Sequence, residues 1–346
     1  MLDKNSKLVI DYIHNYPNLS SKDIFDGLNI NISYATLKRV IAKLKAKNLI
    51  SSIGKGRGTT YKISITYELF CPLNIYAYFE KEIDERQIKD YFNFSLMNEV
   101  LASVNLFAKE ELQHLIKLQE EYTSNISQLS NFEYLRELER LAIDLSWKSS
   151  QIEGNTYSLL ETERLLKEQE TAEGKTKNDA TMLLNHKEAL DFIIAEPNYI
   201  RPLSLARIED IHSILIQHLG IDRNIRKRRV GILGTNYKPL DNEFQIKEAL
   251  EDMCDLVNGK NNIFEKALLL LVLISYIQAF NDGNKRTARI ISNAVLISHN
   301  YCPISFRTVN SIDYKKAMLL FYEQNNITAF KDIFINQFEF AVKTYF

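Results

Sequence analysis

Cysteine, proline and tryptophan are scarce in this chain of 346 residues, which contains three cysteines, six prolines and one tryptophan. Cys71, Cys254 and Cys302 are odd in number and far apart, and none belongs to a CxxC pair. This spacing indicates neither a disulfide framework nor a zinc site. We therefore expect reduced structural thiols.

Long hydrophobic runs are also lacking. The longest extends from Ala267 to Ile277 and contains one serine, whereas a helix needs roughly 18 apolar residues to span a bilayer. The first residues include Asp3 and Lys4 and have neither the apolar stretch nor the cleavage site of a secretory signal. These absences predict a cytoplasmic protein without a membrane partner.

The composition is otherwise ordinary, with 45% hydrophobic and 25% charged residues, which is typical of soluble globular proteins. A formal net charge of -1 would by itself argue against nucleic-acid binding. The charges are unevenly distributed, however. Residues 1–66 contain eleven Lys or Arg and only four acidic residues, which leaves the rest of the chain acidic. This asymmetry predicts a basic nucleic-acid-binding domain joined to an acidic body.

The basic segment, residues 1–66, has the pattern of three helices followed by a hairpin. We expect helices over Lys7–His14, from Ser20 or Ser21 to Gly27, and from Ser33 to about Lys47. A glycine-rich turn over residues 54–58 would join two strands. This order of elements resembles a winged helix-turn-helix domain.

A winged helix implies that the third helix enters the DNA major groove and that the hairpin contacts phosphates. The predicted DNA contacts are Tyr34, Thr36, Lys38, Arg39, Lys43, Lys55 and Arg57. The alternative is a small domain for protein contacts, with solvated lysines. Winged-helix proteins often bind DNA as homodimers, and helices of residues 67–130 would be available as the interface.

From Tyr67 onward the chain has few glycines and prolines and long stretches with helical periodicity, such as Phe132–Gln151 and Phe264–Ile277. We expect a mostly α body divided into residues 67–200 and 201–346, where prolines interrupt helices. The exception is Val230–Leu240, whose Gly-Thr-Asn turn predicts another short hairpin.

The most informative stretch covers residues 278–289. An apolar helix ends there, an Asp-Gly-Asn turn follows, and a new helix begins by Asn284. Backbone N–H groups at a helix N-terminus favour an anion, and Gly283 lets phosphate approach the backbone. Arg286 and Arg289 share a helix face and suit further phosphate oxygens, while Asp282 suits Mg²⁺ bound jointly with a di- or triphosphate.

These residues resemble the active-site motif of the Fic (Fido) family, HxFx[DE]GN[GK]RxxR, most of whose studied members transfer AMP from ATP to a protein hydroxyl. The match comprises Phe280, Asp282, Gly283, Asn284, Lys285, Arg286 and Arg289. The resemblance implies a mostly α Fic/Fido core with a β-hairpin flap, beside the α+β winged helix-turn-helix domain. It also implies ATP and Mg as cofactors and a target protein as partner.

The resemblance further implies roles for individual residues. Asp282 would hold the metal, and Gly283, Asn284, Lys285 and Arg286 would contact the nucleotide. Arg289 would bind the γ-phosphate. The flap would contribute Thr235, Asn236 and Tyr237 beside the nucleotide and the target.

One position departs from the motif, because Gln278 stands where the family has its histidine. In the family that histidine accepts the proton of the attacking hydroxyl, together with a catalytic set that corresponds here to Asp282, Asn284 and Arg286. Glutamine does not titrate near neutral pH, although it can orient a hydroxyl by hydrogen bonding. Loss of a general base typically lowers a rate by about 10² to 10⁴. Nucleotide binding should therefore persist, with transfer weak, altered or absent.

Two alternatives remain open at this point. The chain would be a non-catalytic transcriptional regulator if nucleotide binding at this site alters DNA affinity. It would be a protein phosphotransferase if Lys285 marks a site like that of the Doc-type toxins, which share the Asn-Lys-Arg sequence but lack an arginine equivalent to Arg289.

A second family feature, the inhibitory motif [ST]xxxE[GN], matches Ser149 to Asn155. Ser149 and Glu153 lie one helical turn apart, followed by Gly154 and Asn155. The resemblance implies that Glu153 pairs with Arg289 and excludes the γ-phosphate. The alternative is a helix that ends at Gly154 with a solvated glutamate.

Overall fold

The computed structural model describes residues 3–28 and 32–346, without the side chain of Arg57. Contacts within the chain divide it into two compact units. The first comprises Met1–Leu73 and Gln324–Thr328, and the second comprises Asn74–Glu323 and Ala329–Phe346. The junction near residue 200 lies inside the second unit, where α9 (Lys177–Ala195) packs against α10 (Leu205–Leu215).

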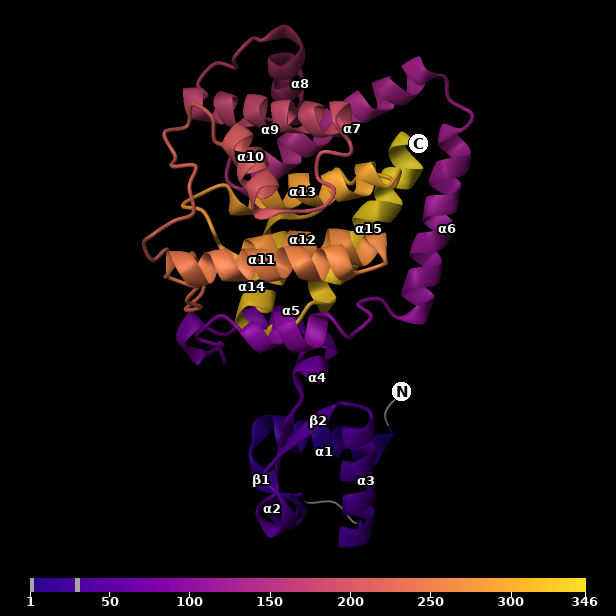
Figure 1. Ribbon diagram of the computed structural model, residues 1–346, viewed down its shortest axis with the longest axis vertical. Helices are drawn as coiled ribbons and strands as arrows, with labels where there is room; N and C mark the ends of the chain where they lie inside the picture. Colours follow the sequence, from indigo (N-terminus) through magenta and orange to yellow (C-terminus); the bar gives the residue numbers. More distant parts are fainter. Residues whose placement is uncertain (1–2, 29–31) are drawn as a thin grey trace. The chain divides into compact units, whose positions relative to one another are not determined.

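The first unit combines helices with a small antiparallel sheet (Figure 1). Its strands lie in the order β1-β3-β2, with Leu19 opposite Tyr61 and Ile50 opposite Ile63. The three expected helices and the expected hairpin are present, whereas the two-residue strand β1 was not predicted. The elements are α1 (Lys4–Asn15), β1 (Leu19–Ser20), α2 (Ser21–Gly27), α3 (Tyr34–Ala46), β2 (Ile50–Ile53), a 3-10 turn (Gly56–Gly58), β3 (Thr60–Ile63) and α4 (Ile65–Phe70).

Local sequence signals explain where these helices begin. Ser20 and Asp23 form a capping box at the start of α2, and the Ser33 side chain caps α3. Apolar side chains at helical spacing on α1 and α3 then bury one face of each helix. They form one core with Ile50 and Ile63 of the hairpin.

The second unit is a mostly α-helical body, as expected, and the helices predicted over Phe132–Gln151 and Phe264–Ile277 are confirmed. Among the described residues, no helix is long and apolar enough to cross a membrane. Its helices are α5 (Ile75–Phe79), α6 (Lys109–Ile126), α7 (Asn131–Ile152), α8 (Leu159–Glu168), α9, α10, α11 (Glu243–Gly259), α12 (Ile263–Ile277), α13 (Asn284–Ser298), α14 (Ser311–Gln324) and α15 (Thr328–Tyr345), with a 3-10 turn at Ile83–Glu85 and a π turn at Leu96–Leu101.

The core of this unit is built around α12, in which every side chain from Ala267 to Ile277 is buried. One side of α13 packs along α12, and α7, α9 and α10 contact α13 as well (Figure 1). The turn between α12 and α13 is therefore held between two groups of helices. Any site at this turn has a rigid frame.

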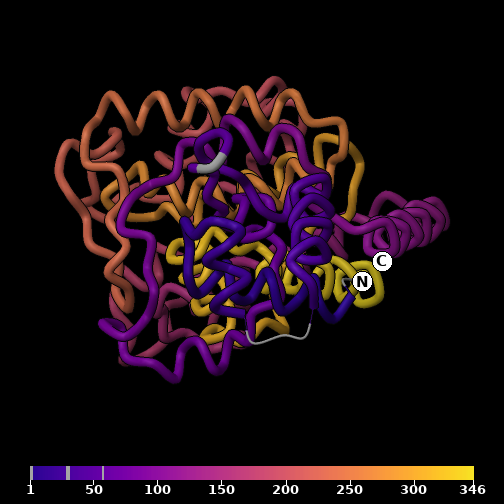
Figure 2. The backbone as a smooth tube through the Cα atoms, turned by 90° about the horizontal axis from the view of Figure 1, so that it is seen from below, coloured from indigo at the N-terminus to yellow at the C-terminus, as the bar shows by residue number. Residues whose placement is uncertain are grey.

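The edge of the second unit is formed by α6, which both backbone views place beside α15 (Figures 1 and 2). Lys331 of α15 pairs with Glu111 of α6 at 2.8 Å. At the other end of α6, the Asn125 amide donates to the carbonyl oxygen of Phe346 at 3.1 Å. These contacts attach α6 to the C-terminal helix.

The hairpin expected over Val230–Leu240 is wrong, because these residues form no strand pair with one another. Lys238 instead makes an isolated parallel bridge with Tyr91, and its N–H donates to the carbonyl of Asp90 at 3.0 Å. Pro239 has no N–H to donate to a hairpin partner. Tertiary packing against residues 90–91 therefore determines the path of this segment. We refer to residues 230–238 as the flap segment.

Candidate functional site

The site begins at the turn between α12 and α13. Gln278 ends α12 in the left-handed conformation at φ 52°, and Gly283 precedes α13 at φ 83°. A Cβ atom at position 283 would lie 3.3 Å from His212 and Ile216, so both the space and the backbone favour glycine. Asn284 closes the turn, because its Oδ1 accepts from the Phe280 N–H at 2.9 Å and its Nδ2 donates to the Phe280 carbonyl at 2.8 Å.

A cavity of about 180 Å³ lies at the N-terminal end of α13. The exposed backbone N–H groups and the dipole of this helix favour an anion there. The structure thus brings Gln278 and the predicted motif residues 282–286 around one small polar space, whereas Phe280 and Arg289 do not line it. The cavity is lined by Glu153, Gly231, Ile232, Leu233, Gln278, Asn281, Asp282, Gly283, Asn284, Lys285 and Arg286.

Both ends of the Gln278 side chain are hydrogen-bonded. Its Nε2 donates to the carbonyl of Ser275 at 2.6 Å and to the Tyr322 hydroxyl at 3.3 Å, and its Oε1 accepts from Asn284 Nδ2 at 3.3 Å. The backbone carbonyl of Gln278 accepts from Arg226 Nε at 2.6 Å. The amide is therefore fixed in place and offers no group that accepts a proton near neutral pH.

His212 is the nearest histidine to the turn, and it does not supply the missing base. Its Nε2 hydrogen-bonds the Asp282 carbonyl at 2.9 Å, and its ring stacks on Phe280 with 3.7 Å between centroids. Burial lowers the pKa of His212 to about 4, so the ring is neutral at physiological pH. We infer that His212 positions the turn between α12 and α13.

Asp282 presents a mostly exposed carboxylate beside the cavity. Its Oδ1 accepts from the Gly283 N–H at 2.6 Å, and its Oδ2 lies 3.3 Å from an Arg286 nitrogen. Across the described ranges, no cluster of three His, Cys, Asp or Glu side chains is present that would hold a metal by itself. A single carboxylate fits Mg²⁺, which usually keeps several waters and shares substrate phosphates.

Arg289 is fully buried and is held by the end of α7. Its Nε donates to Ser149 Oγ at 2.8 Å, and one terminal nitrogen donates to the Ser149 carbonyl at 3.0 Å and to Glu153 Oε1 at 2.8 Å. Lys285 Nζ lies 3.2 Å from the other carboxylate oxygen of Glu153. Glu153 therefore joins two cations of α13, of which the sequence predicted only Arg289.

Glu153 is charged in this arrangement. Burial alone would raise the pKa of Glu153, but Arg289 and Lys285 outweigh it and lower the pKa to about 2. Gly154 follows at φ 102° and ends α7, while Asn155 Nδ2 donates to the Asp179 carbonyl at 2.8 Å. These two residues fix the end of the helix and do not line the cavity.

The flap residues predicted to contact the nucleotide do not line the cavity either. Asn236 Nδ2 donates to Asp84 at 2.9 Å, Thr235 Oγ1 accepts from the Tyr237 N–H, and the Tyr237 ring is buried against Tyr276. Residues 231–233 line the cavity instead. No local pattern predicts this shift, because it follows from packing against a distant segment.

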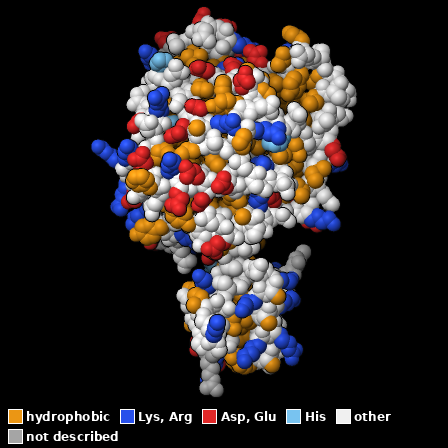
Figure 3. Space-filling model, in the orientation of Figure 1, with side chains coloured by type: hydrophobic (Ala, Val, Ile, Leu, Met, Phe, Trp, Pro, Cys, Tyr) orange, Lys and Arg blue, Asp and Glu red, His pale blue; other side chains and the backbone are white. Residues whose placement is uncertain are grey.

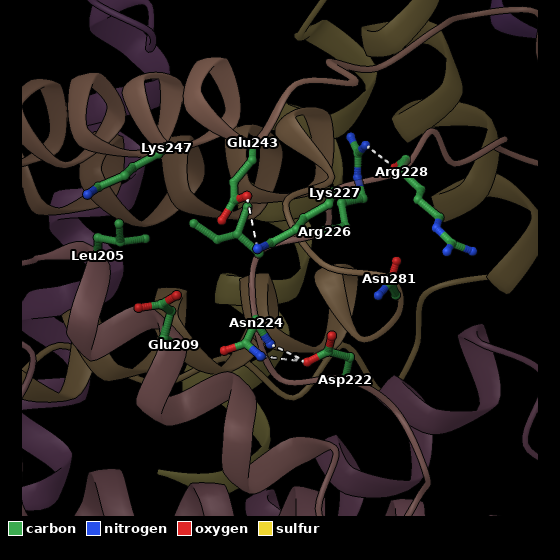
Figure 4. A pocket seen from close by; sticks show the side chains of 11 residues that line it. Leu205, Glu209, Asp222, Asn224, Arg226, Lys227, Arg228, Glu243, Lys247 and Asn281 are labelled. Atoms are coloured by element: carbon green, nitrogen blue, oxygen red, sulfur yellow. Dashed lines mark hydrogen bonds and ion pairs between the residues drawn. The ribbon is translucent and has the colours of Figure 1, made fainter.

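Arg226 is a second residue whose role was not foreseen. Its guanidinium donates to three backbone carbonyls, those of Gln278, Arg228 and Leu240, and so connects the end of α12 to both sides of the flap segment. It borders a larger hollow of about 940 Å³ that shares Asn281 with the cavity (Figure 4). Charged side chains of this hollow pair with each other, as Lys227 and Glu243 do at 3.4 Å.

The predicted DNA contacts lie on α3 and the hairpin of the first unit. Basic side chains gather on the face of this unit seen in Figure 3, with few acidic ones among them. Lys38, Arg39 and Lys55 are exposed, but Lys43 pairs with Asp3 at 2.6 Å.

Two of the remaining predicted contacts are engaged within the unit. The Tyr34 hydroxyl bonds Ser21 at 2.8 Å, and Thr36 Oγ1 bonds Ser33 at 2.9 Å. The side chain of Arg57 lies outside the described part of the structure. Lys38, Arg39 and Lys55 are thus the exposed predicted contacts that form no ion pair within the described residues, and Lys38 Nζ lies 4.8 Å from the centroid of the Tyr34 ring.

Comparison with known proteins identifies relatives of this chain, and the family match lies in the second unit. The Fic/DOC family profile matches residues 202–296. Protein adenylyltransferase Fic of Nematostella vectensis is 27% identical over 175 residues, which is 49% of this chain and 40% of that protein. Protein adenylyltransferase fic-1 of Caenorhabditis elegans is 23% identical over 169 residues, 47% of this chain and 33% of that protein. The chain thus matches less than half the length of these relatives.

Solved structures share the fold. Residues 134–508 of Fic-1 from Caenorhabditis elegans align with a TM-score of 0.60 at 18% identity, over 68% of this chain and 72% of that one. A Fic domain containing signaling protein from Bacteroides thetaiotaomicron aligns with a TM-score of 0.55 at 20% identity, over 66% of this chain and 94% of that one. At these identities the likeness establishes the helical fold alone.

The low pKa of Glu153 generates a prediction about stability and pH. A carboxylate whose pKa falls from about 4.3 in the unfolded chain to about 2 in the folded one stabilises the fold by about 3 kcal/mol. This contribution is complete above about pH 5 and is lost as the pH falls through 2. Chemical denaturation should show that the difference in unfolding free energy between wild type and Glu153→Gln is constant from pH 8 to 5 and shrinks below pH 4. A difference that vanishes near pH 5 would contradict the two ion pairs.

Proposed function

Because the chain contains a Fic/DOC family domain, we propose that it binds ATP with Mg²⁺ at the N-terminus of α13 and transfers AMP slowly to a hydroxyl of a target protein. The observation that carries the proposal is the polar cavity at this helix start, where Asp282 and Arg286 meet the left-handed Gly283. Such a site satisfies phosphate through backbone N–H groups and a fixed cation.

Different residues contact different parts of the nucleotide. Gly283, Asn284 and Arg286 hold the α- and β-phosphates, and Asp282 holds Mg²⁺, which neutralises phosphate charge when it is bound. Arg289 takes the γ-phosphate once Glu153 has left it. Because Arg289 is buried behind Glu153, the nucleotide cannot engage it while the ion pair of 2.8 Å persists.

The rate is limited by Gln278. In AMP transfer, the target hydroxyl attacks the α-phosphorus of ATP, its proton is released and pyrophosphate leaves. Gln278 orients the hydroxyl but does not accept its proton, so the proton passes to solvent. Positioning and electrostatic stabilisation, which supply much of the acceleration in transfer at phosphorus, remain in place.

Glu153 keeps the site inhibited in this proposal. Its carboxylate neutralises Arg289 and Lys285 and repels a triphosphate from the same cavity. Inhibition ends when the end of α7 moves or when ATP competes successfully for the two cations.

A second candidate function is favoured by one observation, the hydrogen bonding at both ends of the Gln278 amide. If this network excludes an incoming hydroxyl, the chain is a nucleotide-responsive regulator whose first unit binds DNA. The exposed Lys38 and Arg39 on α3 supply the contacts to DNA.

Label transfer separates these functions. Full-length wild type, Glu153→Gly, and Glu153→Gly with Gln278→His are incubated with Mg²⁺ and ATP labelled at the α- or the γ-phosphate. We expect α-label on protein with Glu153→Gly, and a rate about 10² to 10⁴ higher when Gln278→His restores the base. Label only in the double variant would establish the regulator instead. Label from γ-ATP alone would indicate phosphate transfer of the Doc type.

Nucleotide affinity tests the role of Lys285. We expect Glu153→Gly to tighten ATP binding by about 10- to 100-fold, because a buried arginine then lacks its partner. In the wild-type background, Lys285→Ala should tighten ATP binding, because the substitution removes one of the two cations that hold Glu153. In the Glu153→Gly background, the same substitution should weaken ATP binding, because Lys285 there faces only phosphate. Calorimetry measures both, with the exposed Lys167→Ala as control. If Lys285→Ala changed the ATP affinity in the same direction in both backgrounds, Glu153 would not be the inhibitory group.

DNA binding through the first unit is tested on the full chain over a range of salt concentrations. Each of Lys38→Ala and Arg39→Ala should weaken binding, and each lost phosphate contact should reduce the slope of log affinity against log salt by about 1. The exposed Lys81→Ala, in the second unit, serves as control. Equal effects of all three substitutions would show that only overall charge matters.

A further inference from the structure

A groove of about 620 Å³ lies beside the flap segment, and the proposed function does not use it. Its walls come from residues 91–94, from the flap segment and from residues 239–245 at the start of α11. We refer to it as the flap groove. Its apolar lining consists of Tyr91, Phe92, Phe94, Val230, Pro239 and Leu240.

The flap groove adjoins the cavity at the start of α13, because Gly231 lines both. Each hollow has an accessible apolar side chain in its lining, since Tyr91 of the groove is 69% exposed and Leu233 of the cavity is 98% exposed. Exposed apolar surface next to a polar site is typical of a binding surface. Of the charged residues that line the groove, Arg229 pairs with Asp241 at 2.5 Å and Lys238 Nζ lies 5.7 Å from the centroid of the Tyr91 ring, so the apolar wall is the main selective feature.

The flap segment also has free backbone groups. In the described part of the chain, the N–H and C=O groups of residues 231–233 bond to no other residue. An extended peptide can pair with such an edge. Because side chains alternate along an extended peptide, a residue two positions from the modified hydroxyl lies about 7 Å away on the same face. Since Gly231 lines both hollows, we take it as the point where such a peptide passes from the cavity to the flap groove.

We propose that the flap groove is a specificity pocket for a large apolar side chain of the target protein, located two residues from the modified hydroxyl. The inference rests on the proposed function, because it assigns the target segment to the same flap. It selects target segments with leucine, methionine or phenylalanine at that position over segments with alanine or aspartate.

The pocket is formed before any target binds. Residues 84–91 hold the flap segment through the Tyr91–Lys238 bridge and through Arg86, which donates to the Gly234 carbonyl at 2.9 Å. Arg86 is fixed in turn by its buried ion pair with Glu323 at 3.1 Å. A preformed wall binds a side chain without the entropy loss of ordering a loop.

The experiment uses fluorescent nine-residue peptides with a central serine and leucine, alanine or aspartate two residues before or after it. Anisotropy with the full-length Glu153→Gly protein should show that leucine at one of these positions tightens binding at least about tenfold over alanine. In that background, Tyr91→Glu and Val230→Glu should abolish the preference. Ile312→Glu, an exposed apolar residue outside the groove, should retain it.

Other outcomes overturn the proposal. Equal affinity for leucine and alanine peptides, or loss of the preference with Ile312→Glu, would show that the groove does not select the target. A dimer in sedimentation that dissociates on Tyr91→Glu would show that the groove binds a second copy of this chain. Calorimetry with ATP on the same samples separates the two proposals. If ATP binds but the peptide preference is absent, only the groove proposal is contradicted. If the peptide preference is present but ATP does not bind, only the nucleotide site is contradicted.

Discussion

The site depends on one constraint, which is that the guanidinium of Arg289 is charged and has no access to water. A buried cation is tolerated only with an anion and hydrogen-bond acceptors around it. Ser149 and Glu153 supply them from α7, and this requirement explains why the end of α7 lies against α13. The same requirement leaves room for a phosphate as the alternative anion. In the proposed function, inhibition and nucleotide binding are thus two ways of satisfying one buried charge.

Lys285 adds a second cation to the competition between Glu153 and a phosphate. With one cation, Glu153 and a phosphate would compete for Arg289 alone, whereas here the carboxylate bridges two cations of successive helical turns. Its low pKa follows from that arrangement, and mild acid cannot release it. Under the proposed function, the inhibited state is therefore opened by movement of α7 or by an anion of higher charge, such as a triphosphate with its metal.

The parts of the site that were predictable from sequence are local. The Asp-Gly-Asn turn, the helix start at Asn284 and the placement of Ser149 one turn from Glu153 follow from short-range patterns, as do α1 to α3. The flap could not be predicted, because its path is set by Asp84, Arg86 and Asp90, more than a hundred residues earlier in the chain. The ion pair of Lys285 with Glu153 could not be predicted for the same reason, since Glu153 comes from another helix.

Gln278 retains the structural role of its position in the motif but lacks a side chain that accepts a proton. Position 278 must end α12 in a left-handed conformation, deliver its carbonyl to Arg226 and place a polar side chain near Asn284. Glutamine meets all three demands, so the turn, the helix start and the anion cavity persist without a titratable group. Gly283 and Asn284 are required by the backbone whether or not chemistry occurs. A match to the motif at these positions is therefore evidence for the fold and the phosphate site, and only the residue at 278 reports on proton transfer.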